Sequence, residues 1–171
     1  MNDPALPVTT NMFWRGRIHD IFAKGKPIHK VIYDIDDLTW SKIQYATAVL
    51  FAKQIKPEMT VLDVGCGIGS SLECLQMIGR ANRYQGLDAS EDLINLARLR
   101  FPGYDFRVQD CSDLSCYPDN HFDIVICREV LEMLENNIGK ELRDKVANEC
   151  RRVGKQFLIF EYTELLAGKV G

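Results

Sequence analysis

The sequence predicts a single α/β domain with a doubly wound, mostly parallel β-sheet. Short apolar segments alternate along the chain with helical segments of about 10–15 residues, which is the pattern of βαβ units. The segment MTVLDVG at 59–65 is almost continuously apolar, as expected for a strand buried on both faces. The length of 171 residues is that of one domain. Right-handed crossovers between parallel strands then put helices on both faces of the sheet.

A long helix is expected before the first strand. It begins at Asp37 and ends near Lys56, because Pro57 disfavours helical geometry at the residue before it. The residues whose helical spacing predicts it are Trp40, Ile43, Thr47, Leu50 and Phe51.

Strands and helices alternate after this helix. The predicted strands are 59–65, 84–88, 105–110, 122–128 and 156–163. Helices are predicted at 70–78, where Gly79 ends the helix, and after Ser90, whose side chain caps the next one. A short helical turn is predicted at 130–134. The last helix has one apolar face, made by Ile138, Leu142, Val146, Cys150 and Val153.

The chain divides into two parts. Residues 1–36 are predicted to be an N-terminal arm, since Pro4 and Pro7 fall in a stretch without periodicity. Within the arm, HKVIYDID at 29–36 is compatible with a short strand or an extended stretch. Residues 37–171 are predicted to form the α/β domain.

Composition and charge argue against several classes of function. The net charge of −3 gives no chain-wide attraction to nucleic acid. No apolar run approaches the roughly 20 residues that span a bilayer, so no membrane association is expected. The N-terminus has no basic start followed by an apolar stretch, and therefore no secretory signal. We expect a cytoplasmic protein.

The six cysteines form no C-x-x-C pair. Cys111 and Cys116 are close in the sequence but have no matching second pair, so a zinc site is disfavoured and no metal is expected. Most of the cysteines lie in apolar segments. Buried free thiols in a reducing compartment are therefore the favoured interpretation.

Three glycines follow the first predicted strand. Gly65, Gly67 and Gly69 lie on the turn to the next helix, at the edge where open α/β sheets bind ligands. Glycine lets the backbone approach a ligand closely, and the helix start offers free N–H groups. A dinucleotide fingerprint G-x-G-x-x-G would need a glycine at position 70 or 72, where the chain has Ser70 and Leu72. A nicotinamide cofactor is therefore disfavoured.

The segment DVGCGIG at 63–69 resembles the first motif of the class I, Rossmann-like, S-adenosylmethionine-dependent methyltransferases. The resemblance covers residues 57–163 and implies S-adenosylmethionine as cofactor and S-adenosylhomocysteine as product. Asp63 would stabilise the ammonium of the methionine end, directly or through water. The alternative is a tight turn in another kind of α/β protein. The residues of this motif implied to bind the cofactor are Asp63, Gly65, Cys66, Gly67 and Gly69.

Two further strand ends fit the same resemblance. Asp88 ends the second predicted strand and would accept hydrogen bonds from the ribose diol, with Leu87 and Ala89 beside the adenine. A helix-capping role is the alternative for Asp88. After the third strand, Asp110 and Cys111 would contact the adenine amine and a ring nitrogen.

The segment HFDIVICREVLEML at 121–134 resembles the fourth motif of the family. Arg128 would lie at the cofactor, near the reactive methyl group, and Glu129 beside it. The family often has a histidine at the position of Glu132, so this departure removes one possible base and leaves the substrate class open. Glu129 and Glu132 are the candidate catalytic bases. Alternatively, Arg128 and Glu129 pair with each other or face solvent.

The resemblance weakens at the C-terminus. The family sheet normally has seven strands, the last two forming an antiparallel hairpin, and too few residues follow 156–163 to supply it. We therefore expect the hairpin to be lacking and the fifth strand to form an apolar sheet edge. A second subunit, as in a homodimer, or the segment 29–36 is expected to cover this edge.

The resemblance implies methyl transfer from S-adenosylmethionine to a small-molecule acceptor by in-line displacement, with an O, N, S or C nucleophile. It also implies that residues 1–36 act as a lid over the substrate. The alternative function is a non-catalytic S-adenosylmethionine-binding partner or regulatory subunit of another methyltransferase. The missing hairpin and the unrecognised base favour that alternative.

Overall fold

The computed structural model describes residues 27–32 and 34–161 of the chain. In this part, the strands form one sheet in the order β3-β2-β1-β4-β5, and every neighbouring pair is parallel. The predicted doubly wound α/β fold is therefore confirmed. The strands are β1 (Val61–Val64), β2 (Tyr84–Asp88), β3 (Asp105–Val108), β4 (Phe122–Arg128) and β5 (Gly154–Phe160).

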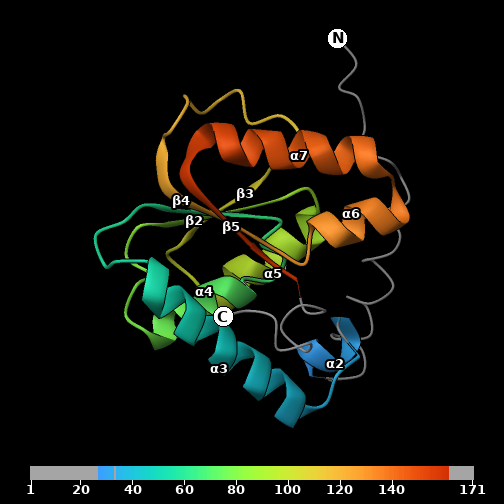
Figure 1. Cartoon of the computed structure of the whole chain (residues 1–171). Helices are drawn as coiled ribbons and strands as arrows, with labels where there is room; N and C mark the ends of the chain where they lie inside the picture. The colour runs from blue at the N-terminus through green and yellow to red at the C-terminus, as the bar shows by residue number, and fades with distance from the viewer. Residues whose placement is uncertain (1–26, 33, 162–171) are drawn as a thin grey trace.

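Helices cover both faces of the sheet (Figure 1). Residues of α3, α4 and α5 share one apolar cluster with the sheet, and residues of α6 and α7 share the other. The connections from β1 to β2 and from β2 to β3 run over the face that α4 and α5 cover. After β4, the connection to β5 through α6 and α7 runs over the opposite face. The helices are α2 (Ile28–Ile32), α3 (Asp37–Gln54), α4 (Ser70–Met77), α5 (Glu91–Arg100), α6 (Leu131–Asn137) and α7 (Lys140–Val153).

The central strand β1 is buried along its whole length, as its apolar sequence predicts. Its neighbours fix its register, with Asp63 opposite Gly86 on one side and Ile126 on the other. Side chains alternate between the faces of a strand, so Val61 packs toward α3–α5 and Leu62 toward α6 and α7. Asp63 is therefore expected on the first face, under α3 and α4.

Residues 29–32 lie in a helix, so the prediction of a short strand or an extended stretch over 29–36 is wrong for these residues. Ile28–Ile32 form the helix α2, in which the Pro27 carbonyl accepts hydrogen bonds from the N–H groups of Lys30 (3.1 Å) and Val31 (3.3 Å). Proline has a φ suited to a helix start, and here it outweighs the β-branched residues. His29 also binds Asp37 at 2.6 Å, which holds α2 against α3.

Strand β5 pairs with β4 and is the edge of the sheet in the described part of the chain. The described residues of the segment 29–36 add no strand to this edge. Cover by a second subunit remains a prediction, and most of the predicted arm, together with residues 162–171, lies outside the described residues.

Five of the cysteines are buried as free thiols and Cys116 is exposed. This agrees with the expectation for most of them. No group of histidine, cysteine or acidic residues among the described residues could hold a metal ion. Within the same residues, no helix is long and apolar enough to cross a membrane.

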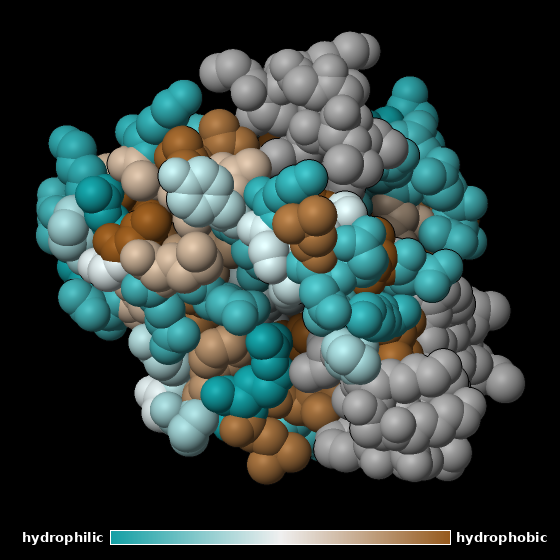
Figure 2. Space-filling view, turned by 90° about the horizontal axis from the view of Figure 1, so that it is seen from below, coloured by the Kyte–Doolittle hydropathy of each residue, from teal (hydrophilic) through white to brown (hydrophobic). Residues whose placement is uncertain are grey.

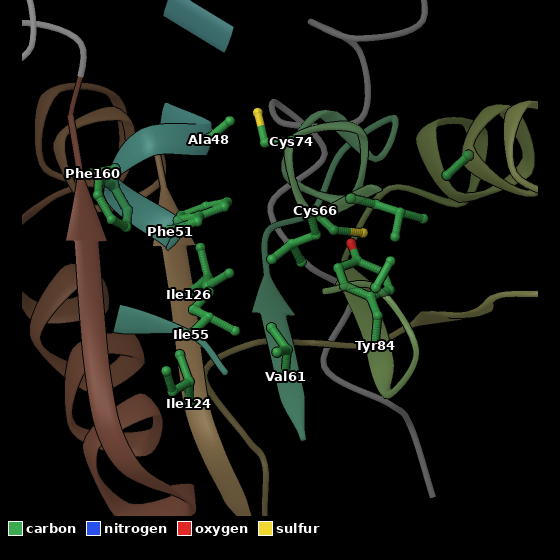
Figure 3. Packing of buried hydrophobic residues seen from close by; sticks show 14 of the residues in the cluster. Ala48, Phe51, Ile55, Val61, Cys66, Cys74, Tyr84, Ile124, Ile126 and Phe160 are labelled. Carbon is green, nitrogen blue, oxygen red and sulfur yellow. The ribbon is translucent and has the colours of Figure 1, made fainter. Parts of the chain in front are cut away.

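Helix α3 is tied to the edge strand by an aromatic contact. The rings of Phe51 and Phe160 meet edge to face with centroids 5.1 Å apart (Figure 3). Phe51 is fully buried, whereas Tyr45 on the same helix is 67% exposed. Figure 2 shows the molecule from below, on the side of α3, where hydrophobic and hydrophilic residues are mixed at the surface. The buried side of α3, which includes Phe51, therefore contributes most of its stabilising contacts.

Replacing Phe51 with Ala should lower the free energy of unfolding by about 3–5 kcal/mol, because the cavity left under α3 cannot fully collapse. Urea denaturation measures the change. Tyr45→Ala is the control, with an expected change within about 0.5 kcal/mol at this exposed position. Equal losses in the two variants would contradict the packing of α3 described above.

Candidate functional site

The candidate site lies at the switch point of the sheet, where the neighbours β1 and β4 are reached by connections on opposite faces (Figure 1). Open α/β sheets bind ligands in the crevice outside the carboxyl ends of such strands. A cleft that is partly open to solvent lies there. Most of the predicted site residues line it, namely Gly65, Gly67, Asp88, Ala89, Asp110, Cys111, Arg128 and Glu129.

The turn after β1 lets the backbone form the floor of this cleft. Gly65 has φ +70°, and a Cβ there would collide with the side chain of Val130. Gly67 has φ +53°, and a Cβ there would meet no protein atom within 4 Å. A side chain at Gly67 would therefore project into the cleft itself. The two glycines serve different needs, close packing at Gly65 and open space for a ligand at Gly67.

Asp88 links this turn to the end of β2. Its Oδ2 accepts a hydrogen bond from the Gly67 N–H at 2.9 Å, and its Oδ1 accepts one from the Ser90 N–H at 2.8 Å. Burial raises the pKa of this carboxyl, while the same N–H donors act in the opposite direction. Ser90, and not Asp88, is the N-cap of α5, with its Oγ accepting from the Leu93 N–H at 3.4 Å. Each carboxylate oxygen can accept a second hydrogen bond, and Asp88 lines the cleft.

The loop after β3 supplies the next wall. The Gln109 N–H donates to the Asp88 carbonyl at 2.9 Å, which keeps the two strand ends in register. Asp110 accepts a hydrogen bond from the Ser112 N–H at 2.8 Å and lines the cleft. Cys111 is buried beside it, and this burial raises the pKa of its thiol. Cys111 is thus a neutral, apolar wall residue and not a nucleophile.

Three predicted cofactor-binding residues, Cys66, Leu87 and Gly69, do not line the cleft but shape it through the backbone. The Cys66 N–H donates to the Leu87 carbonyl at 2.9 Å, which ties the turn to β2. The side chains of Cys66 and Leu87 pack in the two apolar clusters on opposite faces of the sheet. Gly69 is the N-cap of α4 in the left-handed region, and its N–H donates to the Cys66 carbonyl at 2.9 Å.

Asp63 also lies behind the cleft wall and is 1% exposed. Its Oδ2 accepts a hydrogen bond from the Tyr84 hydroxyl at 2.8 Å. Tyr84 comes from β2, and its oxygen points toward Cys66 (Figure 3). Burial raises the pKa of Asp63 to about 7, although Tyr84 and the charge of Arg128 act to lower it. The carboxyl is thus balanced between its neutral and ionised forms near neutral pH.

The end of β4 carries the candidate polar groups of the fourth motif. Arg128 is 6% exposed, and its Nη2 donates to the Gln44 Oε1 at 2.7 Å. Glu129 has φ +61°, an unusual conformation for a residue with a side chain, and its N–H donates to the Phe160 carbonyl at 2.9 Å. Glu132 on α6 does not line the cleft, and its N–H donates to a carboxylate oxygen of Glu161 at 3.2 Å. Of the two candidate bases, only Glu129 reaches the cleft wall.

An apolar wall completes the cleft, and the sequence pattern did not assign it to the site. The sequence shows the helical spacing of these apolar residues, but the same spacing also predicts a helix that packs on the sheet. Leu142 and Val146 illustrate this, because they extend the core-facing side of α7 into the cleft. The unassigned lining residues are Ile68, Leu93, Val130, Met133, Leu134, Ile138, Leu142 and Val146.

The raised pKa of Asp63 predicts a pH-dependent stability. An unfolded aspartate ionises near pH 4, whereas folded Asp63 keeps its proton until about pH 7. The folded state then holds the extra proton between these values, so this carboxyl lowers the stability as the pH rises from about 4 to about 7. The loss amounts to at most about 1.4 kcal/mol per pH unit.

Asp63→Asn should remove this component, because an amide does not titrate and can still accept from the Tyr84 hydroxyl. The stability of the variant relative to the original protein should rise with pH across that window and level off above it. Urea denaturation at several pH values measures the difference. A constant difference from pH 4 to pH 8 would contradict the proton held by Asp63.

Comparison with known proteins identifies the family. The model of the methyltransferase domain matches residues 62–157, which is more than half of the chain. The chain is 41% identical over 107 residues to a fatty-acid O-methyltransferase of Mycolicibacterium smegmatis, covering 61% of this chain and 38% of that protein. It is 35% identical over 85 residues to a ubiquinone biosynthesis O-methyltransferase of Xanthomonas campestris pv. campestris, covering 47% of this chain and 35% of that protein.

A solved structure agrees in fold. The PH0226 protein from Pyrococcus horikoshii OT3 superposes with a TM-score of 0.58 at 30% identity, covering 77% of this chain and 63% of that one. The chain spans little more than a third of the length of the two curated relatives described above. The predicted family and its Rossmann-like fold are confirmed at the level of the domain. The chain belongs to the methyltransferase-domain family.

Proposed function

We propose that the protein transfers the methyl group of S-adenosylmethionine to a small-molecule acceptor by in-line displacement. The observation that carries the proposal is that a glycine turn, the half-buried carboxylate of Asp88 and an apolar wall meet at one cleft at the switch point. A nucleoside needs these three elements, namely close backbone approach, an acceptor for the ribose diol, and an apolar surface for the base. The family match supports the same ligand.

The residues of this chain would act mainly by positioning. When bound, the cofactor supplies a sulfonium methyl group that is already activated for displacement. The protein would hold the adenosyl end between Asp88, Ala89 and the loop at Asp110 and Cys111, while the apolar wall excludes water. Alignment of two reacting groups alone can contribute several kcal/mol, so a dedicated base is needed only for a weakly acidic acceptor.

An oxygen nucleophile is the acceptor chemistry that the comparisons support. The two relatives described above are named as O-methyltransferases of different small molecules. Either a hydroxyl or a carboxylate oxygen fits these names. We infer an O-directed reaction and propose Glu129 as the group that accepts a proton where the acceptor is a hydroxyl.

Calorimetric titration of the protein with S-adenosylmethionine and with NAD tests the choice of cofactor. Binding of the first and not of the second is expected. Methyl transfer is then measured on a panel of phenols, alcohols and carboxylic acids. Binding of S-adenosylmethionine without transfer to any of them would favour the alternative of a non-catalytic binding partner. Binding of NAD alone would contradict the proposal.

Asp88→Asn should weaken the binding of S-adenosylmethionine by about 10-fold or more, because the amide accepts fewer hydrogen bonds from a diol. The carboxylate also holds the Gly67 and Ser90 N–H groups, so the thermal midpoint of the variant must be followed in parallel. Ser90→Ala is the control, since it removes the cap of α5 and leaves Asp88 intact. An unchanged affinity in Asp88→Asn would refute the ribose assignment.

Glu129→Gln should lower kcat for a hydroxyl acceptor by about 100-fold or more if Glu129 removes the proton. Glu132→Gln is the matched control, because Glu132 is near in sequence but does not line the cleft. The pH–rate profile should lose its acidic limb only in the first variant. Equal effects in both variants would exclude Glu129 as the base.

A further inference from the structure

We propose that a groove between α3 and the end of α4 is a docking site for an amphipathic helix of a partner protein, whose polar flanks carry acidic residues. We call this surface the outer groove. It is lined by Tyr45, Val49 and Ala52 from α3 and by Met77 and Ile78 from the end of α4. It shares no lining residue with the cleft at the switch point, so it is a separate feature of the molecule.

The outward side of α3 is apolar. Leu38, Tyr45 and Val49 lie on one side of the helix, because they are seven and four residues apart, and they are 65%, 67% and 40% exposed. The opposite side of α3 is buried against the sheet and is largely apolar too. A helix that is buried on one side only normally carries polar residues on the other side. Helix α3 therefore has the composition of a helix that is covered on both sides.

Helix α7 shows the ordinary pattern on the same sheet. Its buried side is apolar, whereas its exposed positions are all polar or charged, namely Lys140, Glu141, Asp144, Lys145, Asn148 and Arg151. The apolar outer side of α3 is therefore not a general property of the helices that cover this sheet. An apolar surface patch with polar residues at its border is typical of an interaction site.

The charges beside the outer groove are basic. Lys53 lines it, and Lys42 lies on the same side of α3, three residues before Tyr45. Both lysines are exposed, and neither forms an ion pair within residues 27–32 and 34–161. No acidic residue lines the outer groove in this part of the chain. Acidic side chains on a partner would therefore find two available cations at the border of an apolar surface.

The acidic residues of the two helices do not neutralise these lysines. Asp37, the only acid of α3, binds Lys30 of α2 at 3.0 Å. Glu73, the only acid of α4, lies 3.4 Å from Arg100 of α5. Each acid thus has a basic partner on another helix. The positive charge of Lys42 and Lys53 stays available for a partner protein.

A helix fits the outer groove better than a lipid bilayer or a second copy of this chain. The small side chains of Ala48 and Ala52 line the groove and leave room for the side of another helix. A bilayer is flat and would not follow a groove between two helices. In a symmetric dimer this surface would meet itself, so lysines would face lysines and no acid would compensate them.

The test uses three synthetic helical peptides of 18 residues, the length of α3. The first has leucines along one side and glutamates on the flanks. The second has lysines in place of the glutamates, and the third has serines in place of the leucines. Fluorescence anisotropy measures the binding of each labelled peptide to the intact chain. The first peptide should bind at least about 10-fold more tightly than either of the others.

Variants of the protein then locate the binding surface. Val49→Ser and Met77→Ser should each weaken the binding of the first peptide by about 3- to 10-fold, because each removes apolar contacts. Leu99→Ser on α5 is the matched control, since Leu99 is 73% exposed but does not line the outer groove, and it should change nothing. Lys42→Glu combined with Lys53→Glu should reverse the preference, so that the lysine peptide binds more tightly than the glutamate peptide. A merely structural role of the two lysines would not produce this reversal.

Equal binding of the glutamate and lysine peptides would remove the charge complementarity and overturn the proposal. Binding to vesicles of phosphatidylcholine and phosphatidylserine that Val49→Ser abolishes, without binding of any peptide, would assign the surface to a membrane instead. A dimer that the same variant dissociates, as measured by light scattering, would assign it to a second copy of the chain. A monomer that binds neither peptides nor vesicles would overturn the proposal as well.

Discussion

The hydrogen bond from the Gly67 N–H to the Asp88 carboxylate is the constraint on which the site depends. It joins the turn after β1 to the end of β2, so the ends of these two parallel strands lie side by side at the same edge of the sheet. The same carboxylate holds the Ser90 N–H at the start of α5. One half-buried acid therefore organises a turn, a strand end and a helix start. A ligand that also binds Asp88 would meet a group whose direction is already fixed, which lowers the entropic cost of binding.

The opposite end of the cleft depends on charge buried on the face of α3 and α4. Asp63 and Arg128 sit within the sheet ends, and Gln44 connects Arg128 to α4. An isolated ion is costly in such surroundings, so the polar groups must satisfy one another. Helix α3 therefore contributes both the ring of Phe51, which packs in the core, and the side-chain amide of Gln44, which accepts a hydrogen bond from Arg128.

The fold and the polar half of the site could be predicted because each rests on a local pattern. Val61–Val64 forms a buried strand, and the spacing of Gly65, Gly67 and Gly69 excludes a dinucleotide fingerprint. The helix at 28–32 was missed because a start at Pro27 and a contact with Asp37 outweigh β-branched residues. The role of Gln44 depends on a partner far away in the chain, which no local pattern reveals. The apolar wall was missed since Leu142 and Val146 serve core and cleft together.

Glu129 illustrates why the edge strand matters to the site. Its positive φ costs roughly 1 kcal/mol or more for a residue with a side chain, and such strain persists only where the surroundings enforce it. The hydrogen bond from its N–H to the Phe160 carbonyl extends the pairing of β4 with β5 one residue past Arg128. The chain must then turn sharply to begin α6, and the left-handed conformation makes that turn. The backbone position of the candidate base is therefore set by β5, the edge strand that β4 separates from β1 and its glycine turn.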